Sequence, residues 1–308
     1  MSSPMVSICS ITYNHAPFIR QCLDGFLMQQ CNFPIEIIIN DDCSTDGTTE
    51  IIREYAEKYP DKIFPIFHEE NQYSKGVRGM FQKFVFPKAR GKYIAMCEGD
   101  DYWTDPLKLQ KQVDFLESHP DYSMCCHRSK LLYDGLPHVG RSWYEHIDNC
   151  ELDIACIMRP PAIPTASIML RTYVARKAPI HKDFIAGDII IHATALTYGR
   201  VYGLSGEMAI YRRHSDGWSF TTGVHKDIEI LSIPHYLAMM ECFPRKITKE
   251  IKRRVAYKCY DWLLQCRSGH KILSLKFLPK ALFYCNVDLL RIAIVHLHDK
   301  LVRIVKKT

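Results

Sequence analysis

Carboxylates cluster at two places in the first third of the chain, each directly after a run of apolar residues. Asp41 and Asp42 form the first pair. The second cluster consists of Glu98, Asp100 and Asp101. Clustered carboxylates hold a hard divalent cation, and the cation in turn binds phosphate oxygens. Gly99 allows a tight turn inside the second cluster. These acids therefore predict a cation site that serves a phosphorylated ligand.

Some neighbouring residues have simpler explanations. Tyr13 follows the first apolar run and could either meet a ligand or fill the core. Asp46, followed by Gly47, is an ordinary turn or helix-entry signal, and Asp41 could be a helix cap. Turn formation alone is a poor explanation for Asp42 and the second cluster. Four acids directly after two buried strands are more than we expect in loops that have no function.

The spacing of apolar residues alternates along the chain between that of strands and that of helices, and these elements must position the acids. We expect strands at residues 6–11, 35–39, 63–67 and 92–97, separated by helices at 17–30, 46–59 and 75–86. Successive strands lie roughly 28 residues apart, which is βαβ spacing and predicts an open, largely parallel α/β sheet. Ligands of such a sheet bind at the carboxyl ends of its strands, where the acids lie.

The second half of the chain is less regular. Asp105-Pro106 is typical of the cap and first residue of a helix, which would run to about Ser118. Beyond it we expect strands at 122–127 and 166–170, a helix from near Asp188, and helices from Gly223 to the end.

Composition narrows the class of protein. Of the 308 residues, 47% are apolar and 24% charged, which is typical of a globular chain. The 13 cysteines are odd in number and none lies in a C-x-x-C pair, so we expect buried reduced thiols in a cytosolic protein. We expect neither a transmembrane helix nor a signal peptide. The G-x-G-x-x-G, P-loop, H-E-x-x-H and G-x-S-x-G motifs are absent from the sequence.

The net charge of +6 is unevenly distributed. Residues 245–308 carry 16 Lys/Arg and 4 Asp/Glu, a charge of +12, whereas the first 244 residues carry 24 and 30, a charge of −6. Helices are expected at 246–265, 271–284 and 287–306, the last with one apolar stripe. A basic amphipathic helix suits an anionic membrane surface, but a helical cap on the first 244 residues explains it equally well. Nucleic-acid binding is the weakest alternative, because no nucleic-acid module is visible.

Three blocks of the sequence together resemble the family 2 glycosyltransferases of the GT-A fold. They are Val-Ser-Ile-Cys-Ser-Ile-Thr-Tyr-Asn at 6–14, Asp-Asp-Cys-Ser-Thr-Asp-Gly-Thr at 41–48, and Glu-Gly-Asp-Asp-Tyr-Trp at 98–103, followed by Pro106 and Lys108-Leu109. The resemblance covers roughly residues 4–220 and implies an α/β fold with a Rossmann-like, mainly parallel sheet. It divides the chain into a GT-A domain at 1–222, with a nucleotide-sugar half at 1–102 and an acceptor half at 103–222, and a helical, basic C-terminal region at 223–308.

The resemblance also implies roles for single residues. Tyr13 would stack on the nucleotide base and Asp42 would bind the base edge. The whole nucleotide set is Thr12, Tyr13, Asn14, Asp42 and Asp100. A Mg²⁺ or Mn²⁺ ion would be held by Asp101, Asp100 and Glu98, with Asp101 as the direct ligand and Asp100 serving either the ribose or the metal. Glu98 stands where the family more often has Asp, which leaves its role open.

Later residues would supply the chemistry. The block 164–171 resembles the acceptor-side strand of the family, and Gly187-Asp188 resembles its Gly-Asp pair, in which the Asp is the general base. A single carboxylate base gives inversion by direct displacement. The diphosphate would be bound by Arg212, Arg213 and His214. Simpler alternatives are a helix cap for Asp188 and a solvated basic loop for the last three.

The function expected is an inverting, metal-dependent glycosyltransferase of bacterial surface polysaccharide or lipopolysaccharide synthesis. It would act on a glycan or lipid-linked acceptor, peripherally at the cytoplasmic face of the membrane. Uracil is favoured as the base only by the resemblance. Two rivals are a sugar-phosphate nucleotidyltransferase, which would need a Gly-rich basic loop after the first strand, and a non-catalytic subunit that binds nucleotide sugar. Transfer with retention of the anomeric configuration is a further alternative, which analysis of the product anomer would decide.

Overall fold

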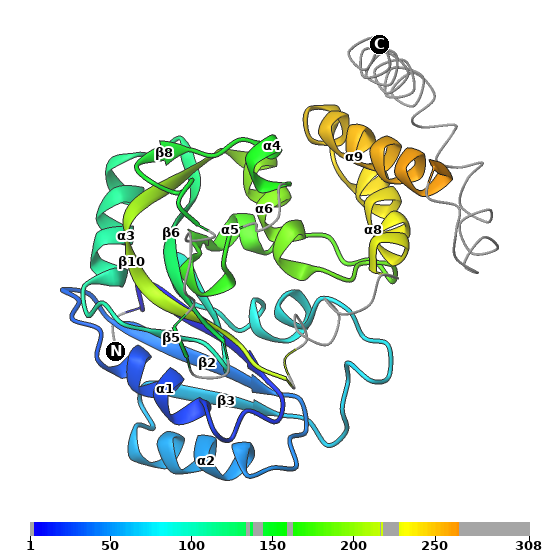
Figure 1. The fold of residues 1–308 in the computed structure, drawn as a ribbon. Coiled ribbons are helices and arrows are strands. Elements are labelled where there is room, and N and C mark those ends of the chain that lie inside the picture. The colour runs from blue at the N-terminus through cyan, green and yellow to red at the C-terminus, as the bar shows by residue number, and fades with distance from the viewer. Residues whose placement is uncertain are drawn as a thin grey trace, which may run out of the picture. The chain divides into compact units, whose positions relative to one another are not determined.

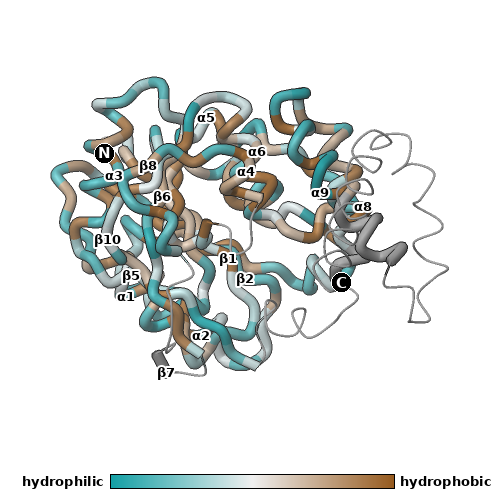
Figure 2. The backbone as a smooth tube through the Cα atoms, turned by 45° about the horizontal axis from the view of Figure 1, so that its top comes forward, coloured by the Kyte–Doolittle hydropathy of each residue, from teal (hydrophilic) through white to brown (hydrophobic). Residues whose placement is uncertain are grey.

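The structure is a computed structural model, and it describes residues 3–133, 136–137, 144–158, 163–215, 217 and 228–264 (Figure 1). Contacts divide the chain into two compact units, one of residues 1–182 with 186–220 and one of residues 183–185 with 221–308. Hydrophobic residues are concentrated on the central strands and hydrophilic ones on the outer loops (Figure 2).

The first unit is built on one mainly parallel sheet of order β3-β2-β1-β4-β9-β6-β10-β5. Its first four strands are β1 (Val6–Thr12), β2 (Ile35–Asp41), β3 (Ile63–Phe67) and β4 (Tyr93–Glu98). They are all parallel, as βαβ spacing predicts. The central strands are buried on both faces, which explains why most of their residues are apolar. The predicted α/β fold class is confirmed.

The second half of the sheet is mixed. Its strands are β5 (Tyr102–Trp103), β6 (Tyr122–Tyr133), β9 (Met169–Arg171) and β10 (Arg200–Arg213), with short β7 (Leu136–Pro137) and β8 (Cys150–Glu151) beside them. β9 runs antiparallel between β4 and β6, whereas β10 runs parallel to β6. The sequence analysis did not predict β10. Its pairing with β6 is irregular between Leu204 and Ala209, so apolar and polar residues do not alternate regularly along it.

Helices connect the strands of the first half. They are α1 (Ile19–Leu27), α2 (Thr48–Lys58) and the π-helical turn η1 (Phe81–Val85). The helix predicted at 75–86 is therefore mostly wrong. Gly76 and Gly79 have left-handed φ values of 86° and 70°, which interrupt a helix before η1 begins.

The helices of the second half begin with α3 (Lys108–Ser118). Its first residue lies three positions after the predicted cap Asp105, whose carboxylate accepts from the Leu107 amide at 2.8 Å. The others are α4 (Ile154–Ile157), the 3₁₀ turn η2 (Thr165–Ser167), α5 (Thr172–Ala175) and α6 (Gly187–Tyr198). The strand predicted at 166–170 is thus η2 followed by β9.

The described part of the second unit consists mainly of α8 (Ile228–Cys242) and α9 (Arg245–Leu264), which pack against each other. Both helices carry buried apolar residues, such as Leu237 and Ile251. α9 confirms the helix predicted at 246–265, whereas the helices predicted at 271–284 and 287–306 lie outside the described residues. Among the helices that are described, none is long and apolar enough to span a membrane. Ten of the described cysteines are free thiols, but only half of these are buried, so the prediction of buried thiols holds only for Cys9, Cys22, Cys97, Cys125 and Cys126.

Candidate active site

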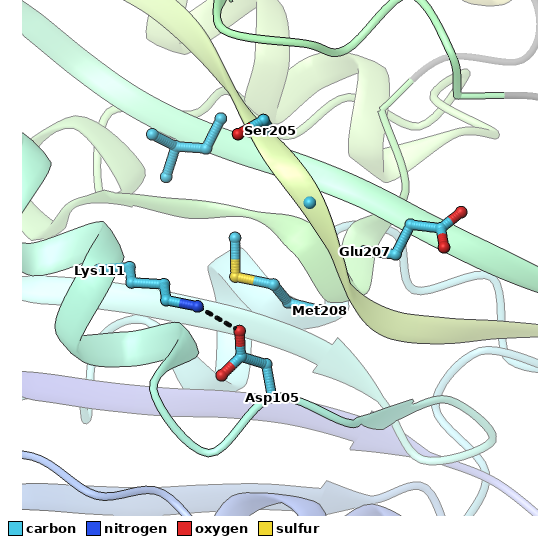
Figure 3. Close-up of a pocket in the computed structure, with 7 residues that line it drawn as sticks. Asp105, Lys111, Ser205, Glu207 and Met208 are labelled. Carbon is cyan, nitrogen blue, oxygen red and sulfur yellow. Dashed lines mark hydrogen bonds and ion pairs between the residues drawn. The ribbon is translucent and has the colours of Figure 1, made fainter.

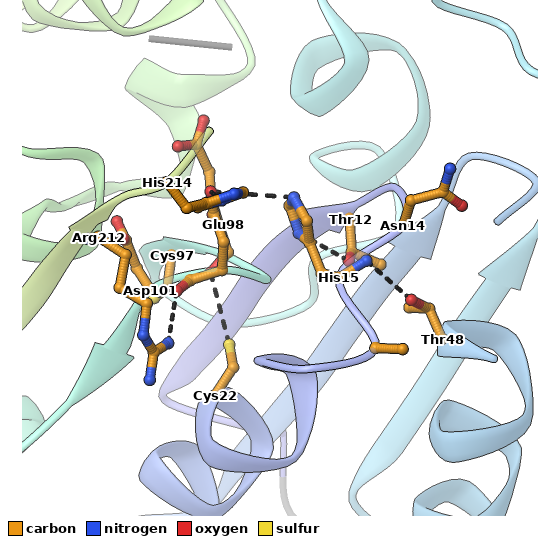
Figure 4. A network of polar contacts seen from close by, with 12 residues as sticks. Thr12, Asn14, His15, Cys22, Thr48, Cys97, Glu98, Asp101, Arg212 and His214 are labelled. Atoms are coloured by element: carbon orange, nitrogen blue, oxygen red, sulfur yellow. Dashed lines mark hydrogen bonds and ion pairs between the residues drawn. The ribbon is translucent and has the colours of Figure 1, made fainter. Parts of the chain in front are cut away.

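The two acidic clusters meet at one edge of the sheet because their strands are parallel and in register. Thr12 at the end of β1 pairs with Asp41 of β2, and Ile11 pairs with Glu98 of β4. The loops that follow these strands therefore converge, and Thr12, His15, Glu98 and Asp101 appear together in Figure 4. This edge is where the sequence predicted the site.

The second cluster sits in a tight turn between β4 and β5. The Gly99 amide donates to the Ile11 carbonyl at 3.0 Å, and the Asp101 amide donates to the Glu98 carbonyl at 3.1 Å. A Cβ atom on Gly99 would lie 2.5 Å from Thr12 Oγ1 and 2.7 Å from Thr12 Cβ. Real Cβ atoms do not approach so closely, so glycine is required here for the acidic turn to lie against β1.

Replacing Gly99 with Ala should therefore move the acidic turn away from β1. We expect the variant to fold and to lose at least about 100-fold in transfer rate, since an ångström of misplacement is enough for such a loss. Initial rates of nucleoside-diphosphate release would show it. The melting temperature of the variant would show that it is folded. A transfer rate within twofold of the wild type would contradict the prediction.

Burial and repulsion between the carboxylates shift the pKa values of the acidic cluster. Burial raises the pKa of Glu98 to about 8, and the charges of Asp100 and Asp188 add to the shift. Burial also raises the pKa of Asp101 well above its ordinary value, reinforced by the charge of Asp100. For Asp100, burial alone would raise the pKa, but the hydrogen bond with His214 and the charge of His15 outweigh it and the pKa is lowered. A bound cation would relieve this repulsion.

Two carboxylate oxygens of the cluster are buried without any hydrogen-bond partner, Asp100 Oδ1 and Asp101 Oδ2. The other Asp101 oxygen accepts from the Arg212 amide at 2.8 Å. Ligand atoms of Glu98, Asp100 and Asp101 lie within 4.8 Å of one another. Buried carboxylate oxygens normally have a donor or a cation beside them. The donor set therefore fits a divalent cation.

Two histidines flank Asp100. Nε2 of His214 lies 3.3 Å from Asp100 Oδ2, and Nε2 of His15 lies 3.8 Å from the same oxygen. The sequence analysis gave His15 no role, and the only signal was its place directly after the Thr-Tyr-Asn block. Ligand atoms of His15, Asp100 and His214 also lie within 4.8 Å of one another.

The predicted nucleotide residues differ in exposure. Tyr13 is 44% exposed, so it is available for stacking and does not fill the core. Asp42 is 4% exposed, and its two carboxylate oxygens accept from the backbone amides of Gln72 and Tyr73 at 2.8 and 3.0 Å. Asn14, at a left-handed φ of 53°, accepts from the Thr45 amide.

Asp46 has the structural role that its turn signal indicates. Its carboxylate accepts from the Ala16 amide at 2.9 Å and from the hydroxyl and amide of Thr48. The Thr48 hydroxyl in turn accepts from the His15 amide at 2.8 Å. The start of α2 thus fixes the loop that carries Tyr13 and His15.

Asp188 lies in the first turn of α6 and is not its cap, since the N-cap residue is Ala186. Its Oδ1 accepts from the Ile189 amide at 2.8 Å. Burial raises the pKa of Asp188, although backbone hydrogen bonds oppose the shift. The charge of Asp188 contributes to the raised pKa of Glu98, so the two carboxyls are close enough to interact electrostatically. The structure therefore brings Asp188 to the acidic cluster across about 90 residues of sequence.

Tyr144 is a second residue that the sequence analysis did not predict. It is buried, and its pKa is raised well above the ordinary value by burial and then by the neighbouring Tyr211, Asp101 and Asp188. Tyr144 comes from the long polar stretch between β6 and α4, which carries no recognisable motif. It is therefore close enough to both Asp101 and Asp188 to interact with them electrostatically.

The two arginines at the end of β10 have different partners. The guanidinium of Arg212 donates to the Asp100 carbonyl at 2.5 Å and to Gln21, and it lies 4.3 Å from the centre of the Tyr102 ring. Arg212 thus holds the acidic turn. The guanidinium of Arg213 donates to the Tyr133 hydroxyl at 2.8 Å.

A separate hollow of about 420 Å³ lies between the start of α3 and the irregular part of β10 (Figure 3). It is lined by Asp105, Lys111, Leu204, Ser205, Gly206, Glu207 and Met208. Asp105 and Lys111 are paired with each other at 2.6 Å. None of the predicted site residues lines this hollow.

Comparison with known proteins identifies the class to which this fold and site belong. The family described as Glycosyl transferase family 2 matches residues 7–217, and the chain belongs to this family. The match includes both acidic clusters, Asp188 and the two arginines.

Individual relatives extend the comparison. The chain is 41% identical over 220 residues to an uncharacterized protein of Mycobacterium tuberculosis; the match covers 69% of this chain and 60% of the relative's length. It is 33% identical over 266 residues to a Bacillus subtilis protein provisionally named as the teichuronic acid biosynthesis glycosyltransferase TuaG, covering 82% of this chain and 98% of TuaG.

Solved structures show the same fold. TarS of S. aureus in complex with UDP-GlcNAc has a TM-score of 0.60 at 18% identity, over 91% of this chain and 79% of TarS. A mannosyltransferase of Pyrobaculum calidifontis in complex with GDP-Man and Mn²⁺ has a TM-score of 0.56 at 18% identity, over 97% and 89% of the two chains. The chain therefore has the fold of GT-A glycosyltransferases.

Proposed function

We propose that this chain is an inverting, metal-dependent glycosyltransferase. It would move a sugar from a nucleoside-diphosphate sugar to a hydroxyl of a glycan or lipid-linked acceptor in bacterial surface polysaccharide synthesis. The proposal is carried by the convergence of Asp188 with Glu98, Asp100 and Asp101 at the carboxyl edge of the sheet. The family and the relative named for teichuronic acid biosynthesis support it.

Asp188 is the proposed general base. The acceptor hydroxyl would attack the anomeric carbon while its proton passes to the Asp188 carboxylate, and the bond to the diphosphate oxygen would break. A base works best when its pKa lies near the working pH, and burial shifts the pKa of Asp188 in that direction. Attack from the side opposite the diphosphate inverts the anomeric carbon.

Residues at the ends of β1 and β2 would hold the nucleotide. We assign Tyr13 to stacking on the base, because it is exposed at the site. Thr12, Asn14 and Asp42 are assigned to the same pocket, where they also fix the surrounding loops. Asp100 would serve the ribose or the metal.

Asp101, Asp100 and Glu98 would hold a Mg²⁺ or Mn²⁺ ion, since two of their oxygens have no other partner. When bound, such an ion offsets the negative charge that develops on the leaving diphosphate. We assign Arg213 to the diphosphate and give Arg212 the role of holding the acidic turn, because its guanidinium already donates to Asp100 and Gln21.

A donor panel tests the proposal. UDP-, GDP- and dTDP-sugars would be compared by thermal shift and by release of the nucleoside diphosphate, each with Mn²⁺ and with Mg²⁺. We expect UDP to be favoured, although the solved neighbours hold both UDP-GlcNAc and GDP-Man. Binding of a donor without turnover on any acceptor would instead indicate a non-catalytic subunit. Retention of configuration in the product would contradict the inverting mechanism.

We also propose that residues 1–222 form the catalytic domain and that the basic region 223–308 docks on the cytoplasmic face of a membrane. Each Lys or Arg near an anionic surface contributes about 1 kcal/mol. In liposome flotation we expect the chain to float with anionic vesicles. Reversing Lys300, Arg303, Lys306 and Lys307 to Glu should abolish flotation, whereas reversing the exposed Lys58, Lys62, Lys88 and Lys182 should not. Equal flotation of both variants with the vesicles would reject docking by the basic region.

A further inference from the structure

The segment of chain that leads into α6 is held by a histidine of the C-terminal helices. Residues 183–185 belong to the second unit, together with α8 and α9. The proposed base, Asp188, follows three residues after Ile185. We propose that His235 of α8 is a positioning residue for Asp188, because it fixes the backbone at Ile185. This inference rests on the proposed function, since it concerns the base of that reaction, and it gives α8 a part in sugar transfer.

A hydrogen bond joins His235 to the segment before the base. The Ile185 amide donates to Nδ1 of His235 at 3.3 Å. The ring of Phe184 lies 5.6 Å from the His235 ring at an interplanar angle of 74°, which is an edge-to-face arrangement. Phe184 and His235 are both buried, so they are shielded from water. The backbone just before α6 is therefore held by a hydrogen bond and by ring packing.

The protonation state of the His235 ring suits a hydrogen-bond acceptor. Burial lowers the pKa of His235 to about 4, so at neutral pH the ring is neutral and one of its nitrogens can accept. Because Nδ1 accepts from Ile185, the ring proton lies on Nε2. That nitrogen is buried and has no hydrogen-bond partner among the described residues. A buried N–H without a partner costs stability, which an apolar side chain would avoid, so the bond to Ile185 is the reason we infer for a histidine here.

The start of α6 is weakly restrained by its own sequence. Its N-cap residue, Ala186, makes no side-chain hydrogen bond. A Cβ atom on Gly187 would meet nothing within 4 Å, and glycine gives the backbone more freedom than other residues. Asp188 accepts from the Ile189 amide, but this bond lies within the same turn and does not tie the turn to another element. The anchored Ile185 therefore limits how far the carboxyl of Asp188 can move.

Loss of this anchor should slow transfer without weakening donor binding. A general base must lie within hydrogen-bond reach of the proton that it accepts, and a misplacement of about 1 Å can cost about 100-fold in rate. The residues assigned to the nucleotide base follow β1 and β2 in the sequence, and none of them belongs to the segment 183–188. We therefore expect an effect on kcat and little effect on the donor dissociation constant.

Three substitutions of His235 in the full chain test the inference. His235→Leu removes the acceptor, and kcat should fall at least about tenfold while the donor dissociation constant stays within about twofold of the wild type. His235→Asn should keep kcat within about threefold of the wild type, because its Oδ1 is bonded to Cγ as Nδ1 is and can accept from Ile185. His235→Gln places its oxygen one bond further out and should not restore the rate. Leu237→Ala is the control, since it removes buried apolar volume from the same helix and should lower the melting temperature but not kcat.

Hydrogen exchange measures the anchor without any donor. Peptides that cover residues 183–190 should exchange about two- to tenfold faster in His235→Leu than in the wild type, as expected for the loss of one hydrogen bond, and His235→Asn should match the wild type. Unchanged exchange in His235→Leu would overturn the inference, and so would equal losses of kcat in His235→Leu and Leu237→Ala. If His235→Leu does not fold, equal rates for the Asn and Gln variants would overturn it instead. Faster exchange in a chain that turns over no donor would support the anchor and reject the proposed function.

Discussion

Replacing Asp188 with Asn should abolish sugar transfer while leaving nucleotide-sugar binding nearly intact. The amide keeps the size of the carboxyl and can still accept from the Ile189 amide through its oxygen. It cannot accept the proton of the acceptor hydroxyl, and a positioned base contributes about 10²–10⁴-fold to the rate. We therefore expect kcat to fall by that factor with little change in the donor dissociation constant. Product release and isothermal titration with the donor measure the two quantities.

Asp114→Asn is a suitable control, since Asp114 is exposed on α3 and accepts a hydrogen bond from Gln110. It should leave both kcat and donor binding unchanged. Full activity of the Asp188→Asn variant would remove Asp188 as the base and would turn attention to Glu98, whose pKa burial raises to about 8. Loss of donor binding in the same variant would show that Asp188 belongs to the donor pocket instead.

Replacing Asp101 with Asn should destroy the cation dependence of donor binding. The orphaned Oδ2 of Asp101 is a proposed ligand of the ion, and an uncharged amide is a much weaker ligand. Titrations of the donor with and without Mn²⁺ should differ strongly in the wild type and should nearly coincide in the variant. We expect transfer to be lost as well, because the leaving diphosphate would lack the charge that offsets it.

The stability of the Asp101→Asn variant distinguishes loss of cation binding from misfolding. Burial raises the pKa of Asp101 above its unfolded value, so the ionised carboxyl destabilises the fold once the pH rises above that unfolded value. Without metal at neutral pH, the variant should melt no lower than the wild type, and its advantage should shrink as the pH falls toward 4. A much lower melting temperature at neutral pH would show that Asp101 instead holds Arg212 and the turn in place.

The sequence by itself determined the parallel half of the sheet and the edge at which the acids meet. Strands such as β1 and β2 are buried on both faces and are therefore mostly apolar, so their ends are visible in the sequence. Parallel pairing then places Asp41 and Glu98 at the same edge without any knowledge of side-chain contacts. The turn signal at Asp46 likewise predicted the structural role of this residue.

Only the tertiary structure decided which atoms of the site have partners. His214 meets Asp100 across 114 residues of sequence, and β10, which carries it there, has no regular alternation because of its bulges. Asp42 and Asn14 were predicted for the nucleotide, yet their side chains also hold neighbouring loops. Local patterns report how a segment is buried, whereas contacts between distant segments depend on how the whole sheet is assembled. The partners of Asp100 follow from that assembly.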